Sequence, residues 1–131
     1  NTCVSVTISD NVLDSTLTDG TGEEGILVNG DEISVTGNII KRFGTENSAN
    51  EAAIKTWSTN GLAITGNVII EPAPKGIRLH ADNLGFTIDG NVIIDPWTNT
   101  VGIAAAYGIS IADTSVGYIG GTSILKNTKY T

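Results

Sequence analysis

The chain has 131 residues, a length typical of one domain, and a formal net charge of −7 at pH 7. Its seven Lys and Arg residues form no cluster along the sequence, which argues against nucleic acid as a partner. One cysteine excludes an internal disulfide, and the absence of a long apolar run argues against membrane insertion.

Short runs of alternating apolar and polar residues recur along the chain, and each ends at a bend. Four of them, at residues 6–13, 33–40, 62–69 and 86–93, share the phrase Φ-x-Φ-x-Gly-Asn-Φ-Φ, where Φ is apolar and the first copy has Asp for Gly. A fifth copy at 117–124 carries Thr122 in place of Asn. The phrase returns every 24 to 31 residues, which predicts a stacked repeat with variable insertions.

A second strand precedes each phrase, at residues 25–29, 53–57, 76–80 and 108–112. A third, very short strand follows the phrase and is centred on Leu13, Ile40, Ile69, Ile93 and Ile124. Three parallel strands per coil predict an all-β fold, a right-handed single-stranded parallel β-helix of four to five irregular rungs. We expect residues 1–131 to form one segment of a longer chain, because both ends of the coil lack a cap.

The Gly-Asn bend has a physical reason, since Gly and Asn tolerate a positive φ at low cost. Stacked at the inter-strand spacing, Asn11, Asn38, Asn67 and Asn91 can form a ladder of side-chain hydrogen bonds, which Thr122 would interrupt.

Period-2 alternation assigns the core. Inward positions of the first strand are Ile26, Val28, Ile54, Ile77, Leu79, Ile109 and Ile111, with Thr56 as a polar exception; those of the second are Ile8, Val35, Ile64, Ile88 and Ile119.

Outward positions of the first strand place Lys55, Trp57, Arg78 and His80 in two neighbouring rungs. A Trp ring offers a surface on which sugar rings stack, and Arg and Lys donate hydrogen bonds to carboxylates and hydroxyls. The group therefore indicates a substrate-binding site for a polysaccharide, especially an acidic one. The alternative is a solvated face with one incidental Trp and a surface His.

Glu23 and Glu51 each lie three residues before a first-strand Ile, so register would stack them in neighbouring rungs. A carboxylate pair at such a spacing is what a glycoside hydrolase uses, which makes the two residues candidate catalytic groups. Glu24, Asp31, Glu46 and Asp82 compete for these roles, and acidic loop residues are usually only solvated.

A polysaccharide lyase would instead use Lys55 or Arg78 as base, often with Ca²⁺ bound by residues such as Asp82, Asp89 or Asp95. No Asp-x-Asp-x-Asp run supports a metal site, and we expect neither a metal nor a cofactor.

The third strand carries outward aliphatic residues, which form a candidate oligomer interface of Val12, Ile39, Val68, Val92, Ile70 and Ile94. A contiguous outward apolar strip normally marks contact with another surface, and three copies of the chain would bury it in a closed bundle. The alternative is that the insertions 14–24, 41–52 and 95–107 fold back over the strip.

The repeated Φ-x-Φ-x-Gly-Asn-Val-Ile-Ile phrase resembles the pectate-lyase-like right-handed β-helix superfamily over essentially the whole chain. The irregular rungs with an outward aliphatic strip are most similar to bacteriophage tailspikes. That resemblance implies a homotrimer on the virion, outside the cell, which attaches to its host by binding and often hydrolysing bacterial surface polysaccharide such as capsule or lipopolysaccharide. No catalytic motif matches one family, so a non-catalytic structural or adhesin β-helix stays an alternative.

Ice binding, another use of β-solenoids, requires a regular Thr array. The outward column Ser9, Thr36, Thr65, Asp89 and Gly120 is too irregular for it.

Overall fold

The computed structural model describes residues 3–15, 24–44, 50–96, 107–112 and 114–125. In these ranges the regular structure consists of thirteen β-strands. They are β1 (Cys3–Ser9), β2 (Val12–Asp14), β3 (Ile26–Thr36), β4 (Ile39–Lys41), β5 (Ile54–Asn60), β6 (Ala63–Thr65), β7 (Val68–Ile70), β8 (Lys75–Leu79), β9 (Asn83–Asp89), β10 (Val92–Ile94), β11 (Tyr107–Ile111), β12 (Val116–Ile119) and β13 (Ser123–Leu125).

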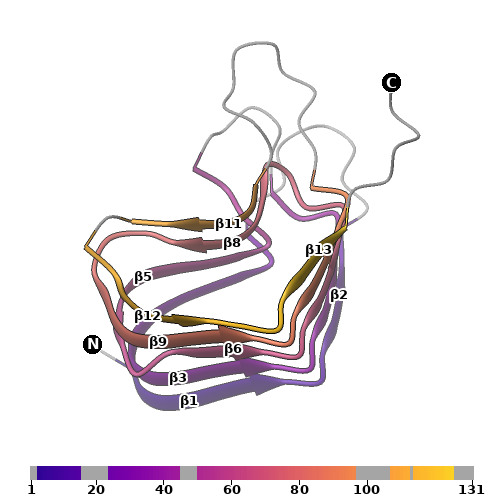
Figure 1. Ribbon diagram of the computed structural model, residues 1–131. Coiled ribbons are helices and arrows are strands. Elements are labelled where there is room, and N and C mark those ends of the chain that lie inside the picture. Colours follow the sequence, from indigo (N-terminus) through magenta and orange to yellow (C-terminus); the bar gives the residue numbers. More distant parts are fainter. Residues whose placement is uncertain (1–2, 16–23, 45–49, 97–106, 113, 126–131) are drawn as a thin grey trace.

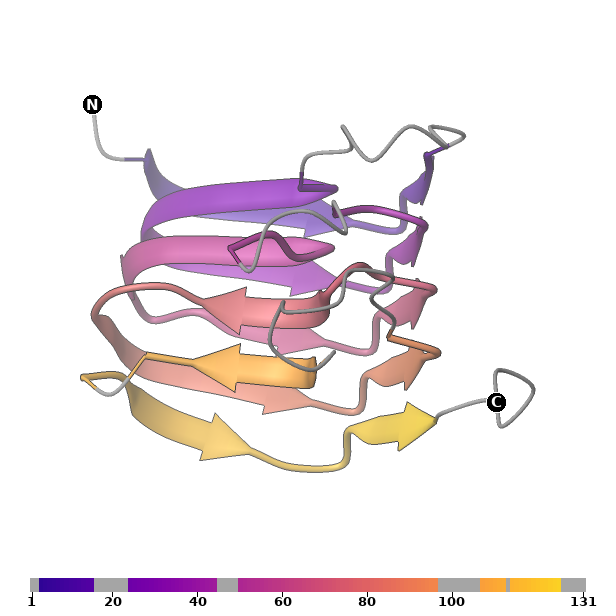
Figure 2. The same ribbon diagram turned by 90° about the horizontal axis from the view of Figure 1, so that it is seen from above.

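The strands stack as a coil with three faces (Figure 1). The first face contains the start of β3, then β5, β8 and β11. The second contains β1, the end of β3, β6, β9 and β12, and the third contains β2, β4, β7, β10 and β13. In Figure 1 the chain turns anticlockwise as it advances from β1 towards the viewer, and Figure 2 shows the rungs side by side. The prediction of a right-handed parallel β-helix is therefore confirmed, with about four turns.

Strand pairing is parallel throughout the described coil, and it follows the predicted register. Ile54 is paired with Ile26 on one side and Ile77 on the other, and Ile64 with Val35 and Ile88. Residues of one column thus stack directly over one another. The consequence is a core built from columns of like side chains.

Burial matches these columns in the middle of the coil. Ile54, Ile64 and Ile88 have 0% of their surface exposed. In the last described rung, Ile119 and Ile124 occupy the same columns but are 45% and 51% exposed. They are exposed because β12 and β13 have a partner strand on one side only in the described coil.

At the bend before the third face, one residue supplies the positive φ and the next supplies the side chain that forms the ladder. Gly37, Gly66, Gly90 and Gly121 have φ values of 67°, 63°, 62° and 40°, and Asp10 has 57°. The residue that follows, Asn in four rungs and Thr122 in the fifth, is not among the residues with positive φ. The expected positive φ is thus present at the bend and is supplied by the Gly or Asp, while the side chains of Asn38, Asn67 and Asn91 turn inward.

The predicted Asn ladder is present. Nδ2 of Asn11, Asn38 and Asn67 donates to Oδ1 of the Asn in the next rung at 3.0, 3.0 and 2.9 Å. The same Oδ1 atoms accept the backbone N–H of the preceding Asn at 3.0 Å. Asn38, Asn67 and Asn91 are fully buried, so the ladder lies inside the coil. At Thr122 the ladder weakens to contacts of 3.4 Å from Asn91.

The other bends also stack, although their residue types differ from rung to rung. Ser5, Glu32, Gly61 and Gly85 have φ between 52° and 74° at the bend between the first and second faces. Arg42, Glu71 and Asp95 have φ between 51° and 58° directly after the third face. Equivalent backbone conformations at equivalent positions keep the cross-section of the coil constant from rung to rung.

Removing one internal amide of the ladder should cost stability. Asn67→Ala leaves the backbone N–H and the amide of Asn38 without their acceptor, and we expect the free energy of unfolding to fall by about 2–4 kcal/mol. Urea denaturation measures the change. The control is Asn11→Ala, since Asn11 is exposed and its loss should cost under about 1 kcal/mol. Equal losses for the two variants would contradict a stabilising role of the buried ladder.

Candidate functional site

Lys55, Trp57, Arg78 and His80 lie on the outside of the first face, and we call them the first-face strip. Lys55 of β5 is directly paired with Arg78 of β8. Trp57 lies two residues further along β5, and His80 directly follows the end of β8. The structure therefore brings together the four residues that the sequence placed side by side, whereas their role in substrate binding stays a prediction.

Trp57, His80 and Arg78 form one contact group. The rings of Trp57 and His80 are edge-to-face, with centroids 4.2 Å apart and an interplanar angle of 88°. Nη2 of Arg78 lies 3.1 Å from Nδ1 of His80. A guanidinium can only donate, so Nδ1 accepts and the neutral imidazole carries its proton on Nε2. Trp57 remains 42% exposed, which leaves much of its surface open to a ligand.

A β-bulge positions Trp57. β3 and β5 lose register between Val28 and Gly30, where β5 has one extra residue. The pair Trp57–Ser58 there lies opposite Asn29 alone. Bulges bend a strand and re-aim its side chains, and they are frequent beside functional sites. The sequence carries a sign of this bulge, because the interval from the first-strand Ile to the Asn of the phrase is 12 residues from Ile26 to Asn38 but 13 residues from Ile54 to Asn67.

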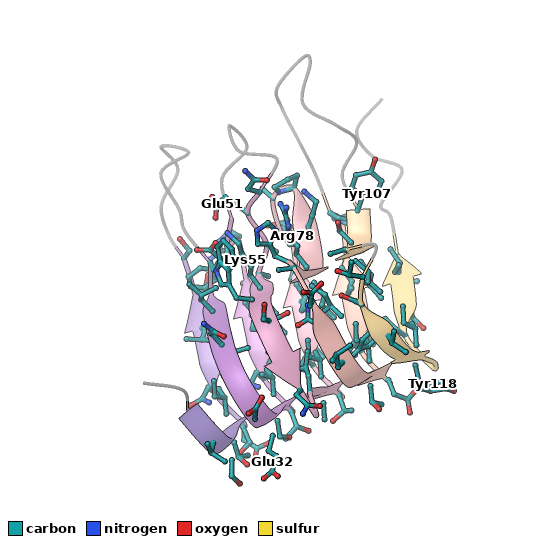
Figure 3. All side chains as sticks on the ribbon, turned by 90° about the vertical axis from the view of Figure 1, so that its left-hand side faces the viewer. Glu32, Glu51, Lys55, Arg78, Tyr107 and Tyr118 are labelled. Carbon is teal, nitrogen blue, oxygen red and sulfur yellow. The ribbon has the colours of Figure 1, made fainter. Side chains whose placement is uncertain are left out.

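Lys55 is held by two carboxylates. Its Nζ forms an ion pair with Glu24, and Glu51 lies 3.9 Å away. Lys55 is only 8% exposed. Burial alone would raise the pKa of Glu24, but hydrogen bonds with Lys55, with the backbone and with Glu51 outweigh it and lower that pKa. The Lys55 cation therefore stabilises an ionic cluster at the edge of the strip (Figure 3).

Lys75 belongs to this cluster and was not singled out by the sequence analysis. It is 6% exposed. Burial lowers the pKa of its ammonium group, as do the charges of Arg78 and Lys55, against an opposite effect of Glu51. Its spacing was a possible signal, since it lies two residues before the first-face Ile of its rung, as Glu24 does in its own.

The predicted catalytic pair is only half described. Glu23 lies outside the described residues, as does its competitor Glu46. Glu51 and Glu24, which had been named as a competitor, both interact with the Nζ atom of Lys55. They therefore belong to one ionic cluster, and catalysis by Glu23 and Glu51 stays a prediction.

The calcium ligands considered for a lyase lie at different bends. Asp82 follows β8, Asp89 ends β9 and Asp95 follows β10. Among the described residues, no three His, Cys, Asp or Glu side chains are grouped as a metal ion would require. Nothing in this part of the chain adds support to the lyase alternative.

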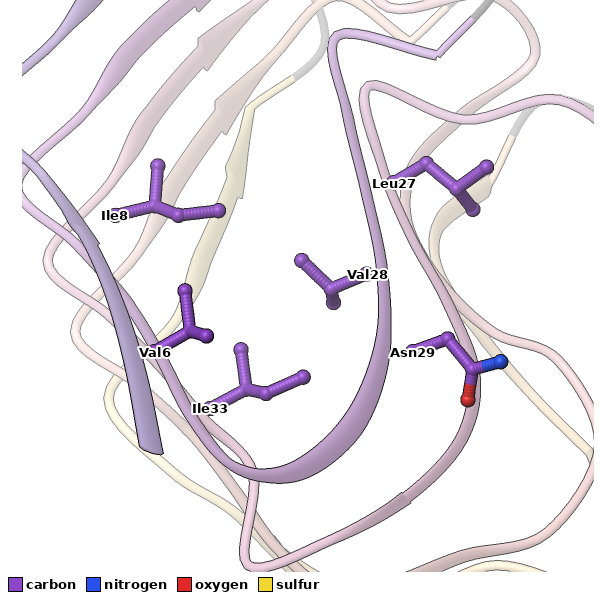
Figure 4. A pocket seen from close by; sticks show the side chains of 6 residues that line it. All are labelled: Val6, Ile8, Leu27, Val28, Asn29 and Ile33. Carbon is purple, nitrogen blue, oxygen red and sulfur yellow. The ribbon is translucent and has the colours of Figure 1, made fainter. Parts of the chain in front are cut away.

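A pocket of about 260 Å³ lies between β1 and β3 (Figure 4). Val6, Ile8, Val28 and Ile33 point into it, and Leu27 and Asn29 lie on the other side of β3. Its interior is apolar and offers few hydrogen-bonding groups to a sugar.

The outward aliphatic residues of the third face stack as predicted. Val12, Ile39, Val68 and Val92 form one register column, and Ile70 and Ile94 pair in the next. Val12 and Ile39 are 68% and 37% exposed, and the other four are partly buried. Residues 16–23, 45–49 and 97–106 of the insertions that could cover this face lie outside the described residues, so self-association through it stays a prediction.

Comparisons with protein-family models, with curated proteins and with solved structures give no match for this chain. The candidate site therefore rests on the geometry of this chain alone. In the described part of the chain there is no helix of the length and apolar character that crossing a membrane requires.

The titration of His80 tests the geometry of the strip. Burial lowers the pKa of its imidazole below 6.5, and the charges of Arg78 and Lys55 lower it further. Arg78→Gln should raise the pKa part of the way back towards 6.5, because burial remains. Since the chain has one His, its imidazole proton signal in an NMR titration is unambiguous.

Lys41→Gln, on the third face, is the control and should leave the pKa of His80 unchanged. Because the folded state binds this proton less tightly than the unfolded state, His80 contributes stability that is lost as pH falls below 6.5. A pKa at or above 6.5 in the unmodified protein would contradict the contacts described.

Proposed function

We propose that this chain binds polysaccharide, and an acidic polysaccharide in particular, on the first-face strip. The observation that carries the proposal is Trp57, exposed on the outside of the coil with His80 against its ring and Arg78 beside it. An exposed aromatic ring provides a stacking surface for a sugar, and a neighbouring guanidinium can bind a carboxylate through two parallel hydrogen bonds.

The local charge favours an acidic ligand. The whole chain carries a net charge of −7, yet Lys55, Lys75 and Arg78 meet at this face. Burial is the main cause of the lowered pKa of Lys75, and the charges of Arg78 and Lys55 add to it against the opposite effect of Glu51. Together with Glu24 the cluster holds three cations and two carboxylates. A carboxylate bound beside Arg78 would relieve part of the repulsion between these cations, whereas a neutral sugar would gain only the stacking contact.

The biological setting belongs to the same proposal. The resemblance of the repeated phrase to pectate-lyase-like β-helices, and to tailspikes among them, supports bacterial capsule or lipopolysaccharide as the ligand and host attachment by a virion as the role. The geometry of the strip supports binding most directly. Hydrolysis would add Glu51 and Glu23 as catalytic groups, and a non-catalytic adhesin would use the strip alone.

Replacing the exposed aromatic ring should weaken binding. We expect Trp57→Ala to raise the Kd for the bound polymer by about tenfold, the loss of roughly 1.4 kcal/mol of stacking. Arg78→Gln should weaken binding of polygalacturonate and leave binding of neutral dextran unchanged. Calorimetric titration with these two polymers, and with capsule and lipopolysaccharide preparations, measures both effects.

Tyr118→Ala is the matched control, since Tyr118 is 60% exposed but lies on the second face. An unchanged Kd in Trp57→Ala would overturn the proposed site. The same mixtures are assayed for new reducing ends. Reducing ends that appear with the unmodified protein but not with Glu51→Gln, while Glu51→Gln still binds the polymer, would identify a hydrolase. Binding without any new reducing ends would identify an adhesin.

We propose further that the third-face aliphatic strip is buried between copies of this chain in a homotrimer. The strip is continuous along four rungs, and on its first two rungs it remains clearly exposed. Burying such a strip stabilises association by roughly 25 cal/mol for each Å² of apolar surface removed from water.

A charge at the centre of the strip should prevent this association. Val68→Lys is expected to convert a trimer to monomers, because a buried unpaired ammonium is costly. Sedimentation velocity measures the oligomeric state. Thr87→Lys, which adds the same charge on the second face, should leave the trimer intact. A monomeric unmodified protein would contradict the proposal.

A further inference from the structure

A buried Asn on the inside of the coil lies directly behind the first-face strip. Asn83 begins β9, outside the repeated Gly-Asn phrase, and its exposed surface is 0%. Its Oδ1 accepts hydrogen bonds from the hydroxyls of Thr56 and Thr59 at 2.8 and 2.7 Å. These two residues flank the pair Trp57–Ser58 on each side, so one oxygen atom ties together both ends of the bulge that carries Trp57.

The amide nitrogen of Asn83 hydrogen-bonds to the turn that follows His80, another residue of the first-face strip. Nδ2 donates to the backbone carbonyl of His80 at 3.3 Å and to that of Ala81 at 2.8 Å. Ala81 has a φ of 61°, a left-handed conformation that a non-glycine residue adopts at some cost. The hydrogen bonds of Asn83 thus fix the turn immediately after His80.

A third contact connects this group to the next rung. Oγ of Ser115 accepts from the backbone N–H of Asn83 at 3.2 Å and donates to the carbonyl of Ala81 at 3.1 Å. The network therefore extends over three rungs. Thr56 and Thr59 are 0% and 4% exposed, so water does not compete for their hydroxyls.

We infer that Asn83 is a positioning residue that sets the placement of Trp57 relative to His80, by holding the Trp57 bulge and the His80 turn through one side chain. Its consequence for glycan affinity rests on the proposed function. The residues of the Asn ladder make the same kind of hydrogen bonds, but at the bend between the second and third faces. They support the coil without touching the residues next to the strip.

The experiment compares two buried amides. Protein labelled with 5-fluorotryptophan gives fluorine NMR signals for Trp57 and Trp97, and the Trp57→Phe variant assigns the Trp57 signal. Asn83→Ala should shift or broaden that signal and raise the Kd for polygalacturonate by about tenfold. Asn67→Ala, the matched control, removes an equally buried amide from the ladder and should leave the signal and the Kd unchanged.

A gentler pair of variants covers the case in which Asn83→Ala does not fold. Thr59→Val keeps the shape of the side chain and removes one of the two hydroxyls bound to Oδ1, so it should shift the Trp57 signal in the same direction. Thr59→Ser retains the hydroxyl and should restore the original signal.

A Trp57 signal unchanged in both Asn83→Ala and Thr59→Val would overturn the inference, and so would an equal shift in Asn67→Ala. If the unmodified protein binds no polymer, the proposed function fails while the fluorine signal still decides the role of Asn83.

Discussion

Every rung of this coil depends on the rungs beside it for its buried polar groups. The interior amides of Asn38, Asn67 and Asn91 donate to backbone carbonyls of their own and of the preceding rung, and to the Asn, or Thr122, that the next rung presents at the same height. A slip of one residue would break the hydrogen bonds that these amides make between rungs and turn the Ile columns outward. The ladder thus specifies register as well as contributing stability, and all other columns follow from that register.

Because the register is fixed, outward side chains of neighbouring rungs lie side by side and form a defined surface. Lys55 and Arg78 meet outside the coil because Ile54 and Ile77 meet inside it. The candidate site lies where this regularity is locally broken, at the bulge that carries Trp57. The break is tolerated because Asn83 provides, within the core, the hydrogen bonds that the distorted strand requires.

Much of this architecture could be predicted from the sequence, because the Ile columns and the Gly-Asn phrase repeat in residue type as well as in position. The bends at Ser5, Glu32 and Gly61 could not, since their shared conformation is imposed by neighbouring rungs on unlike residues. The same holds for the site. The strip follows from alternation alone, whereas the placement of Asn83 depends on hydrogen bonds with Thr56 and Thr59, which lie 27 and 24 positions away in the sequence.

The direction of the hydrogen bonds determines how the coil resists a force applied to it. Backbone hydrogen bonds between rungs lie along the axis, and the strands β5 and β8 lie across it (Figure 2). A pull on Trp57 along its strand loads all the hydrogen bonds of that strand together, in shear. A pull along the axis instead stretches the hydrogen bonds between one pair of rungs. A load applied at Trp57 across the coil is therefore resisted on both sides of β5 at once, by its hydrogen bonds with β3 and with β8.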